Sequence, residues 1–266
     1  MAELDISLHP AQLKIFRSNK RFKIVAAGRR FGKSYLSAWL LLINAIQSES
    51  KDVFYIAPTF QQAKDIMWSM LKELGKDLIL QAYENTAVLT LINGRKIYLK
   101  GSDRPETLRG VGLSYVVLDE YASMKPVVWE QIIRPTLADV KGRALFIGTP
   151  AGKNHFFDLY QDAQEDDDWD AFQFTSIDNP FLPEEEIEAA SKSMSSMSFR
   201  QEFEASFETF SGGIFKEEWF KEDEEPQEGN YVIAVDPAGY EDSEKERNLK
   251  RSRLDETAIS IVKIDR

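Results

Sequence analysis

Short runs of consecutive apolar residues alternate along the first 150 residues with longer segments whose apolar positions recur at helical spacing. Such runs predict strands buried on both faces, and a spacing of three to four predicts helices between them. The predicted strands cover residues 22–27, 53–57, 87–91, 96–100, 115–118 and 144–147. The predicted helices cover residues 34–47, 60–76 and 127–138. This alternation predicts an α/β fold with a mainly parallel central sheet flanked by helices.

Two local signals modify this pattern. Asn93-Gly94 separates two of the predicted strands, and this dipeptide is typical of the tight turn of a β-hairpin. Pro135 falls inside the last predicted helix and should disturb its end, because proline lacks a backbone N–H. We therefore expect one antiparallel hairpin beside the parallel strands and one irregular helix.

The pattern changes in the last third of the chain. Two acidic helical stretches, 184–193 and 198–207, precede Gly212-Gly213, and new strand-like runs follow at 231–235 and 257–264. The polar segment between them reads as a linker. We expect a first domain over residues 1–210, a linker over 211–229 and an incomplete second domain over 230–266, which is too short to fold by itself.

The net charge of −11 is unevenly distributed. Residues 1–150 hold 21 Lys and Arg against 14 Asp and Glu, a balance of +7. Residues 151–266 hold 12 against 30, a balance of −18. The front half can therefore face phosphates, while the rear half would repel DNA. The chain has no cysteine, which excludes disulfides and thiolate metal sites, and no stretch of 18 apolar residues, so we expect a soluble cytoplasmic protein without a membrane segment.

Residues 27–34, Ala-Gly-Arg-Arg-Phe-Gly-Lys-Ser, follow a predicted strand and open a predicted helix. This context is typical of a phosphate-binding loop, whose backbone N–H groups wrap phosphates at a helix N-terminus. Lys33 would add a positive charge, and the hydroxyl of Ser34 would bind Mg²⁺. Ala27 replaces the usual first glycine, so the match is to a relaxed pattern. We predict that ATP is bound by Ala27, Gly28, Arg29, Arg30, Gly32, Lys33 and Ser34.

Two further strand ends carry candidate partners of this loop. Asp119 and Glu120 follow the apolar run 116–118, and adjacent carboxylates at a strand end can take separate tasks. Asp119 would hold Mg²⁺, and Glu120 would orient and deprotonate the attacking water. Thr149 ends another apolar strand and could sense the γ-phosphate. The alternative for both is a plain strand end that reaches solvent.

In this order the motifs resemble those of the large subunit of tailed-phage and herpesvirus-type DNA-packaging terminases. The resemblance spans about residues 8–150 and is carried by residues 9–12, 27–34, 56–63, 108–110, 116–122 and 148–150. It implies a P-loop NTPase of the additional-strand, catalytic-glutamate type. It also implies an ATP hydrolase that drives double-stranded DNA into a procapsid.

The resemblance assigns further roles. Arg29 would sense or neutralise charge on the γ-phosphate, and Arg109 matches a position that reaches the ATP of a neighbouring subunit. Gln12 would contact adenine, and Thr149 falls in a motif that couples hydrolysis to movement. The implied partners are DNA, the portal, the procapsid, the small terminase subunit and a homo-oligomeric ring of about five copies, with a monomer in solution as the alternative. The implied location is the host cytoplasm, outside the mature virion.

Members of the family also carry a C-terminal nuclease of the ribonuclease H type. Residues 231–237 resemble its first strand, with Asp236 as the first metal ligand, and Asp255 lies where another acidic residue occurs. A complete nuclease would hold a second divalent metal site for Mg²⁺ or Mn²⁺. The other acidic ligands of the family would lie beyond residue 266. We therefore expect a fragment without nuclease activity.

Two other functions remain open at this point. A helicase or another DNA translocase would also carry Pro58-Thr59 and Gln61, but it would need a second lobe with its own arginine motif. An inactive remnant that only binds partners is the second alternative. Basic residues near the predicted hairpin could bind DNA phosphates or form a solvated edge: Arg95, Lys96, Lys100 and Arg104.

Overall fold

The computed structural model describes residues 6–208, 230–236 and 258–264. The chain separates into two compact units, Met1–Ser211 and Gly212–Arg266. The first unit contains a sheet of eight strands and the helices that cover it, and the second contains a pair of strands. No helix in the described ranges combines the length and the apolar character needed to cross a membrane.

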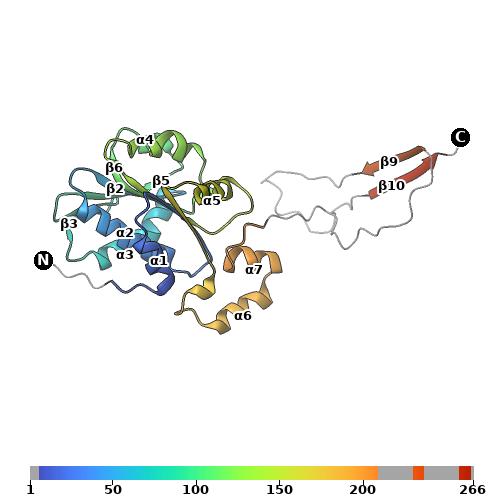
Figure 1. Cartoon of the computed structure of the whole chain (residues 1–266), viewed down its shortest axis with the longest axis horizontal. Coiled ribbons are helices and arrows are strands. Elements are labelled where there is room, and N and C mark those ends of the chain that lie inside the picture. The colour runs from blue at the N-terminus through green and yellow to red at the C-terminus, as the bar shows by residue number, and fades with distance from the viewer. Residues whose placement is uncertain (1–5, 209–229, 237–257, 265–266) are drawn as a thin grey trace. The chain divides into compact units, whose positions relative to one another are not determined.

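Six strands of the large sheet are parallel to one another (Figure 1). They are β1 (Phe22–Ala27), β2 (Asp52–Ala57), β5 (Lys96–Gly101), β6 (Leu113–Asp119), β7 (Arg143–Gly148) and β8 (Trp169–Phe174). The order across the sheet is β3-β4-β5-β2-β6-β7-β1-β8, so β7 lies between β6 and β1. The predicted mainly parallel α/β fold is confirmed, and β7 is the additional strand.

The predicted hairpin is also confirmed. Strand β4 (Val88–Leu91) runs antiparallel to β5, and Asn93-Gly94 lies in the turn, where Gly94 adopts a φ of 80°. A further antiparallel strand, β3 (Ile79–Tyr83), pairs with β4 at the edge of the sheet. Strand β3 was not predicted, because it is exposed on most positions and lacks a continuous apolar run.

Helices cover both faces of the sheet, as the unbroken burial of β1 requires. One face packs against α1 (Pro10–Arg17), α2 (Lys33–Gln47) and α3 (Phe60–Leu74). The other packs against α5 (His155–Glu165) and the π-helix Val128–Ile133, which α4 (Arg134–Thr136) follows in the chain. The predicted helix 127–138 is therefore real but irregular, since Pro135 cannot donate to the preceding turn. The helices α1 and α5 and the strand β8 were not predicted.

Short helical segments connect these elements. They are the 3₁₀ turns η1 (Pro105–Leu108), η2 (Tyr121–Ser123) and η4 (Ser176–Asp178). Two acidic helices, α6 (Glu184–Ser193) and α7 (Ser196–Phe203), follow. The second begins two residues before its predicted start, because the hydroxyl of Ser195 accepts a hydrogen bond from the backbone of Ser198 and caps the helix.

In the second unit β9 (Asn230–Asp236) and β10 (Ala258–Ile264) form an antiparallel pair. Both strands lie where apolar runs predicted them. Asp236 is the last residue of β9 and pairs with Ala258. The predicted linker 211–229, which includes Gly212-Gly213, and Asp255 lie outside the described residues.

Candidate functional site

The segment between β1 and α2 forms a loop that turns sharply at two positions. Arg30 and Gly32 both adopt positive φ angles, 63° and 94°. Gly32 precedes the first turn of α2, and no side chain in the described structure caps that end. A helix N-terminus with free N–H groups attracts an anion, because unpaired donors and the helix dipole act together. The loop therefore has the geometry expected of the predicted phosphate-binding loop.

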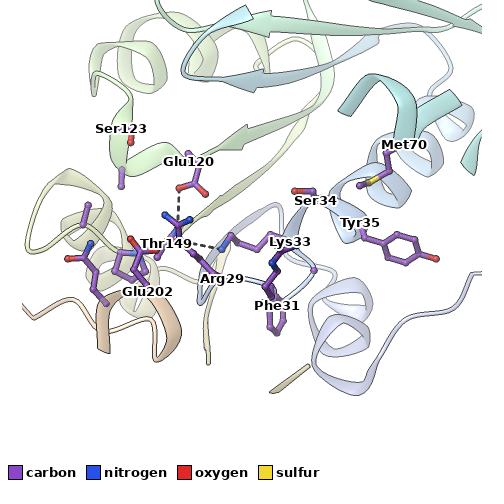
Figure 2. Close-up of a pocket in the computed structure, with 16 residues that line it drawn as sticks. Arg29, Phe31, Lys33, Ser34, Tyr35, Met70, Glu120, Ser123, Thr149 and Glu202 are labelled. Carbon is purple, nitrogen blue, oxygen red and sulfur yellow. Dashed lines mark hydrogen bonds and ion pairs between the residues drawn. The ribbon is translucent and has the colours of Figure 1, made fainter. Parts of the chain in front are cut away.

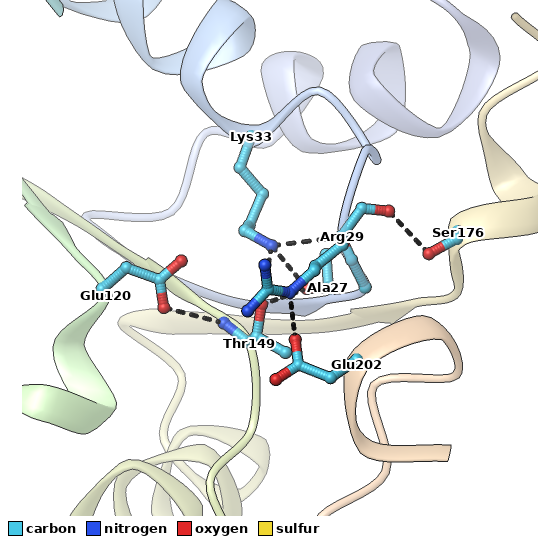
Figure 3. A network of polar contacts seen from close by, with 8 residues as sticks. Ala27, Arg29, Lys33, Glu120, Thr149, Ser176 and Glu202 are labelled. Atoms are coloured by element: carbon cyan, nitrogen blue, oxygen red, sulfur yellow. Dashed lines mark hydrogen bonds and ion pairs between the residues drawn. The ribbon is translucent and has the colours of Figure 1, made fainter. Parts of the chain in front are cut away.

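Lys33 reaches back over this loop (Figure 3). Its ammonium donates to the carbonyl oxygens of Ala27 and Gly28 at 2.6 and 3.1 Å, and to the hydroxyl of Thr149 at 3.1 Å. Burial lowers the pKa of Lys33, while the nearby carboxylates of Glu120 and Asp119 oppose that effect. Its acceptors are neutral, so the ammonium keeps most of its charge available for a phosphate.

Asp119 and Glu120 end β6, and the backbone turns between them. Glu120 adopts a left-handed conformation with φ 51° and ψ 47°, which is unusual for a residue other than glycine. Asp119 is buried and accepts hydrogen bonds from the hydroxyl of Tyr55 and, at 2.9 Å, from the backbone N–H of Glu120. Burial and the charge of Glu120 raise the pKa of Asp119 to about 6. The two carboxylates therefore face different surroundings, as their predicted separate tasks require.

Glu120 lies in an open pocket of about 620 Å³. Its carboxylate also accepts a hydrogen bond from the backbone N–H of Thr149 at 3.4 Å. Figure 2 shows Lys33 and Arg29 extending from the loop toward Glu120 and Thr149. The pocket is lined by residues 29–35, 120, 122, 123, 149–151, 201 and 202, together with Met70. Three strand ends that are far apart in sequence therefore meet around one cavity.

Residues that could hold a divalent cation are Ser34 and Asp119. A hydroxyl and a carboxylate are hard oxygen donors that suit Mg²⁺. Asp119 is buried, and among the described residues no Lys, Arg or His nitrogen lies within 4 Å of its carboxylate. The donor set thus fits the cation that ATP would bring.

The outer side of the loop is held by residues that the motif analysis did not identify. The carboxylate of Glu202 on α7 pairs with Nε of Arg29, and the hydroxyl of Ser176 donates to the carbonyl oxygen of Arg29 at 2.6 Å. A Cβ atom on Gly28 would lie 2.5 Å from the carbonyl oxygen of Phe203, so only glycine allows this approach. No sequence signal placed α7 beside a loop about 170 residues earlier. Tyr55 falls inside the predicted strand 53–57, and nothing in that apolar run distinguishes it from a core residue.

Gln12 lies beside the loop but outside the lining of the pocket. Its amide nitrogen donates to the carbonyl oxygen of Gly32 at 3.0 Å, and its amide oxygen accepts from the backbone N–H of His9 at 3.2 Å. This capping box, with the proline at position 10, explains why α1 starts there. Both ends of the amide are therefore engaged within the protein, and an adenine contact by Gln12 stays a prediction.

Arg109 is also outside the lining of the pocket. It is exposed and follows η1, just before Gly110, whose φ of 80° turns the chain. A role toward a neighbouring subunit stays a prediction.

The basic residues near the hairpin make different contacts within the protein. The guanidinium of Arg95 donates to the carbonyl oxygen of Ser50 at 2.7 Å, and the ammonium of Lys100 lies over the ring of Phe54. Lys100 and Arg104 line a separate cavity of about 460 Å³. Their contact with DNA remains a prediction.

The predicted nuclease ligands gain no support from the described residues. In residues 6–208, 230–236 and 258–264, no group of three or more His, Cys, Asp or Glu side chains is arranged to hold a metal. The metal-binding role of Asp236 stays a prediction, as does that of Asp255.

Comparisons with known proteins agree with this geometry. The family model described as terminase large subunit, T4likevirus-type, N-terminal, matches residues 24–222. The terminase large subunit of Escherichia phage T5 is 32% identical over 203 residues, which cover 73% of this chain and 46% of the phage protein. That of Thermus phage G20c is 28% identical over 172 residues, covering 57% and 36%. The chain thus spans less than half the length of these relatives.

Solved structures show the same fold. The ATPase domain of the Thermus phage P74-26 large terminase superposes with a TM-score of 0.68 at 26% identity, covering 77% of this chain and 95% of that domain. The large terminase of a thermophilic bacteriophage in complex with ADP gives a TM-score of 0.68 at 18% identity, covering 87% and 62%. The pocket, the order of the strands and the family match lead to one conclusion: this chain belongs to the terminase large subunit family.

Proposed function

We propose that this chain binds ATP with Mg²⁺ and hydrolyses it to drive double-stranded DNA into a procapsid. The observation that supports the proposal most strongly is the meeting of Lys33, Glu120 and Thr149 in one pocket with the loop. Glu120 and Thr149 follow the carboxyl ends of two neighbouring strands, and Lys33 begins α2. Ligands of α/β sheets bind at the carboxyl ends of the strands. The solved relatives described as an ATPase domain and as bound to ADP support the same ligand.

In the proposed reaction Glu120 accepts a proton from water as the water oxygen attacks the γ-phosphorus. The bond between the γ-phosphorus and the bridging oxygen of ADP breaks, and ADP and phosphate leave. Lys33, Arg29 and the loop N–H groups, including those of Arg30 and Gly32, stabilise the charge on the transferred group. When bound to Ser34 and Asp119, Mg²⁺ would supply further positive charge for the β- and γ-phosphates.

Other roles in this proposal rest on the family. Gln12 would contact adenine, Arg109 would reach the ATP of a neighbouring subunit, and Thr149 would couple hydrolysis to movement. The hydroxyl of Thr149 already contacts Lys33, which supports a link between the β7 end and the phosphate site. The proposed partners are DNA, the portal and procapsid, the small terminase subunit and further copies of the chain in a ring of about five, in the host cytoplasm.

Phosphate release by the purified chain tests the hydrolase proposal. We expect Glu120→Gln to lower the ATP turnover at least about 100-fold, because a general base typically contributes 10²–10⁴. The change conserves shape, so nucleotide binding should remain. Turnover should be measured with and without double-stranded DNA and at high protein concentration, since Arg109 would act between subunits.

The matched control is Glu185→Gln, the same change at an exposed position of α6 that does not line the pocket. It should leave turnover unchanged. If the wild-type chain releases no more phosphate than Glu120→Gln under any of these conditions, the hydrolase proposal is wrong. Strand displacement by the wild-type chain would favour a helicase instead.

A further inference from the structure

The end of α7 contacts the phosphate-binding loop in two ways. The backbone N–H of Arg29 donates to the carbonyl oxygen of Glu202 at 2.7 Å. The carboxylate of Glu202 also accepts from Nε of Arg29 (Figure 3). One residue of α7 therefore holds both the backbone and the side chain of an arginine within the loop.

The backbone contact already fixes α7 against the loop without the carboxylate. Gly28 leaves room for the carbonyl oxygen of Phe203, and its own N–H donates to the carbonyl oxygen of Phe174 at 3.0 Å. The hydroxyl of Ser176 holds the carbonyl oxygen of Arg29 from the same side. Removing the carboxylate of Glu202 would leave all of these contacts in place. Removing this carboxylate should therefore change only the position of the Arg29 side chain.

The ion pair does little for the stability of the fold. The side chain of Arg29 is 67% exposed and that of Glu202 is 20% exposed. Exposed ion pairs add little to stability, because water screens them and ordering the side chains costs entropy. The pair does restrict the direction of a long side chain that would otherwise move freely in water.

The ion pair leaves the terminal nitrogens of Arg29 directed toward the proposed phosphate site. Glu202 occupies Nε, which leaves the two terminal nitrogens of the guanidinium without that partner. In Figures 2 and 3 these nitrogens lie on the side turned from Glu202 toward Lys33 and Glu120. A guanidinium offers its donors in a rigid fork, so fixing one nitrogen fixes the direction of the others.

We propose that Glu202 is a positioning residue that orients Arg29 toward the γ-phosphate. The proposal rests on the proposed ATP site and names a residue outside its motifs. Glu202 acts through Arg29 and does not itself need to touch ATP. By holding the guanidinium before ATP arrives, it reduces the reorganisation that the reaction requires.

The test is a double-mutant cycle on ATP turnover with Arg29→Ala, Glu202→Ala and the double variant. We expect Glu202→Ala to lower kcat about tenfold with a smaller change in KM, because a misdirected donor mainly affects the transition state. In the Arg29→Ala background the same change should have no further effect. Glu202→Gln keeps an oxygen that Nε can bond, so its kcat should lie between those of the wild type and Glu202→Ala.

Nucleotide affinity provides a second measurement. Glu202→Ala should weaken the binding of an ATP analogue that is hydrolysed slowly, such as ATP-γ-S, several-fold relative to ADP, since only the former has a γ-phosphate. The control is Glu204→Ala, an exposed glutamate at the end of the same helix. Glu204→Ala should change neither kcat nor the ratio of the affinities for ATP-γ-S and ADP.

The alternative outcomes are distinct. An increase in kcat for Glu202→Ala would mean that Glu202 restrains Arg29 and inhibits the site, which overturns the proposal. Equal losses in the wild-type and Arg29→Ala backgrounds, together with a lower melting temperature, would mean a structural role and overturn it as well. A wild-type chain without turnover refutes the hydrolase proposal, whereas an active wild type that tolerates Glu202→Ala refutes only the role of Glu202.

Discussion

One lysine lies at the carboxyl ends of the parallel strands and another at their amino ends, and the surroundings of the two differ. At the carboxyl edge Lys33 has three oxygen partners and lies near Asp119 and Glu120. At the amino edge Lys23, only 6% exposed, donates to the carbonyl oxygen of Ile15 at 3.1 Å and lies near Arg143. Among the described residues, no carboxylate oxygen lies within 4 Å of its ammonium.

Two tyrosines on the same face of the sheet repeat this contrast. The hydroxyl of Tyr55 donates to Asp119. The hydroxyl of Tyr115, near the start of β6, has no hydrogen-bond partner among the described residues and lines a cavity of about 180 Å³ with Lys23 and Arg143. The two ends of the parallel strands also differ in which helix end meets them. The N-terminus of α2 meets the carboxyl edge and attracts anions, while the C-terminus of α1 offers carbonyl oxygens at the amino edge, where Lys23 caps one of them.

The largest expected effect separates the two lysines. Lys33→Ala should lower ATP turnover at least about 100-fold, because it removes a positive charge beside the proposed phosphate site. Lys23→Met should leave turnover within about twofold, since its ammonium only caps a helix carbonyl. Steady-state phosphate release measures both. Comparable losses in the two variants would show that the edges do not differ in function.

A second prediction concerns the pH dependence of stability. Burial, with a smaller contribution from the charge of Arg143, lowers the pKa of Lys23 from 10.5 to about 8. Between these values the folded protein binds fewer protons than the unfolded chain, so the free energy of unfolding should rise with pH. From pH 8 to 9.5 the gain from this residue is roughly 1.5 kcal/mol, at 1.36 kcal/mol per pKa unit, because the folded-state lysine is already half deprotonated at pH 8.

Other groups titrate in this range, so the measurement is the difference between the wild type and Lys23→Met in urea unfolding at several pH values. The wild type should gain stability relative to the variant as the pH rises. A difference that is independent of pH would show that Lys23 is not desolvated as its burial indicates.

The smallest effect on turnover is expected from removing one tyrosine hydroxyl at each end of the parallel strands. Tyr55→Phe should lower turnover about tenfold, because Asp119 loses a donor that orients it, and losses of 10–100-fold are typical when a partner of a metal ligand is removed. The matched control, Tyr115→Phe, removes a hydroxyl without a described partner. It should leave turnover unchanged and alter the free energy of unfolding by about 1 kcal/mol or less, in the stabilising direction. A larger loss of turnover in Tyr115→Phe would reverse the comparison.

Much of the fold follows from local patterns. Continuous apolar runs located β1, β2, β6 and β7, and Asn93-Gly94 located the hairpin of β4 and β5. The helix α1 was missed because its signals are a proline and a capping box of only a few residues. Strand β8 was missed because polar residues interrupt its apolar residues, so the strand has no continuous apolar run. The short π-helix before Pro135 shows that a proline inside a predicted helix changes its type rather than removing it.

Some residues of the candidate site could be predicted from the sequence, and others could not. The sequence predicted Lys33, Glu120 and Thr149 as site residues because each lies at the junction of an apolar run and a polar motif. Such junctions collect at the carboxyl ends of parallel strands, and the structure places all three residues in the lining of one pocket. Tyr55 and Glu202 were not found. One reads as a core aromatic and the other as an acidic residue on an exposed helix, and only their spatial neighbours distinguish them.

By itself, the sequence determined the alternation of strands and helices, the glycine-containing loop between β1 and α2 and the carboxylates at the end of β6. These features depend on residues close together in the chain, where periodicity and backbone geometry act directly. The tertiary structure decided which side chains hold them in place: Tyr55 on Asp119, and Glu202 with Ser176 on Arg29. These contacts join residues 64, 173 and 147 positions apart, and packing alone brings them within hydrogen-bonding distance.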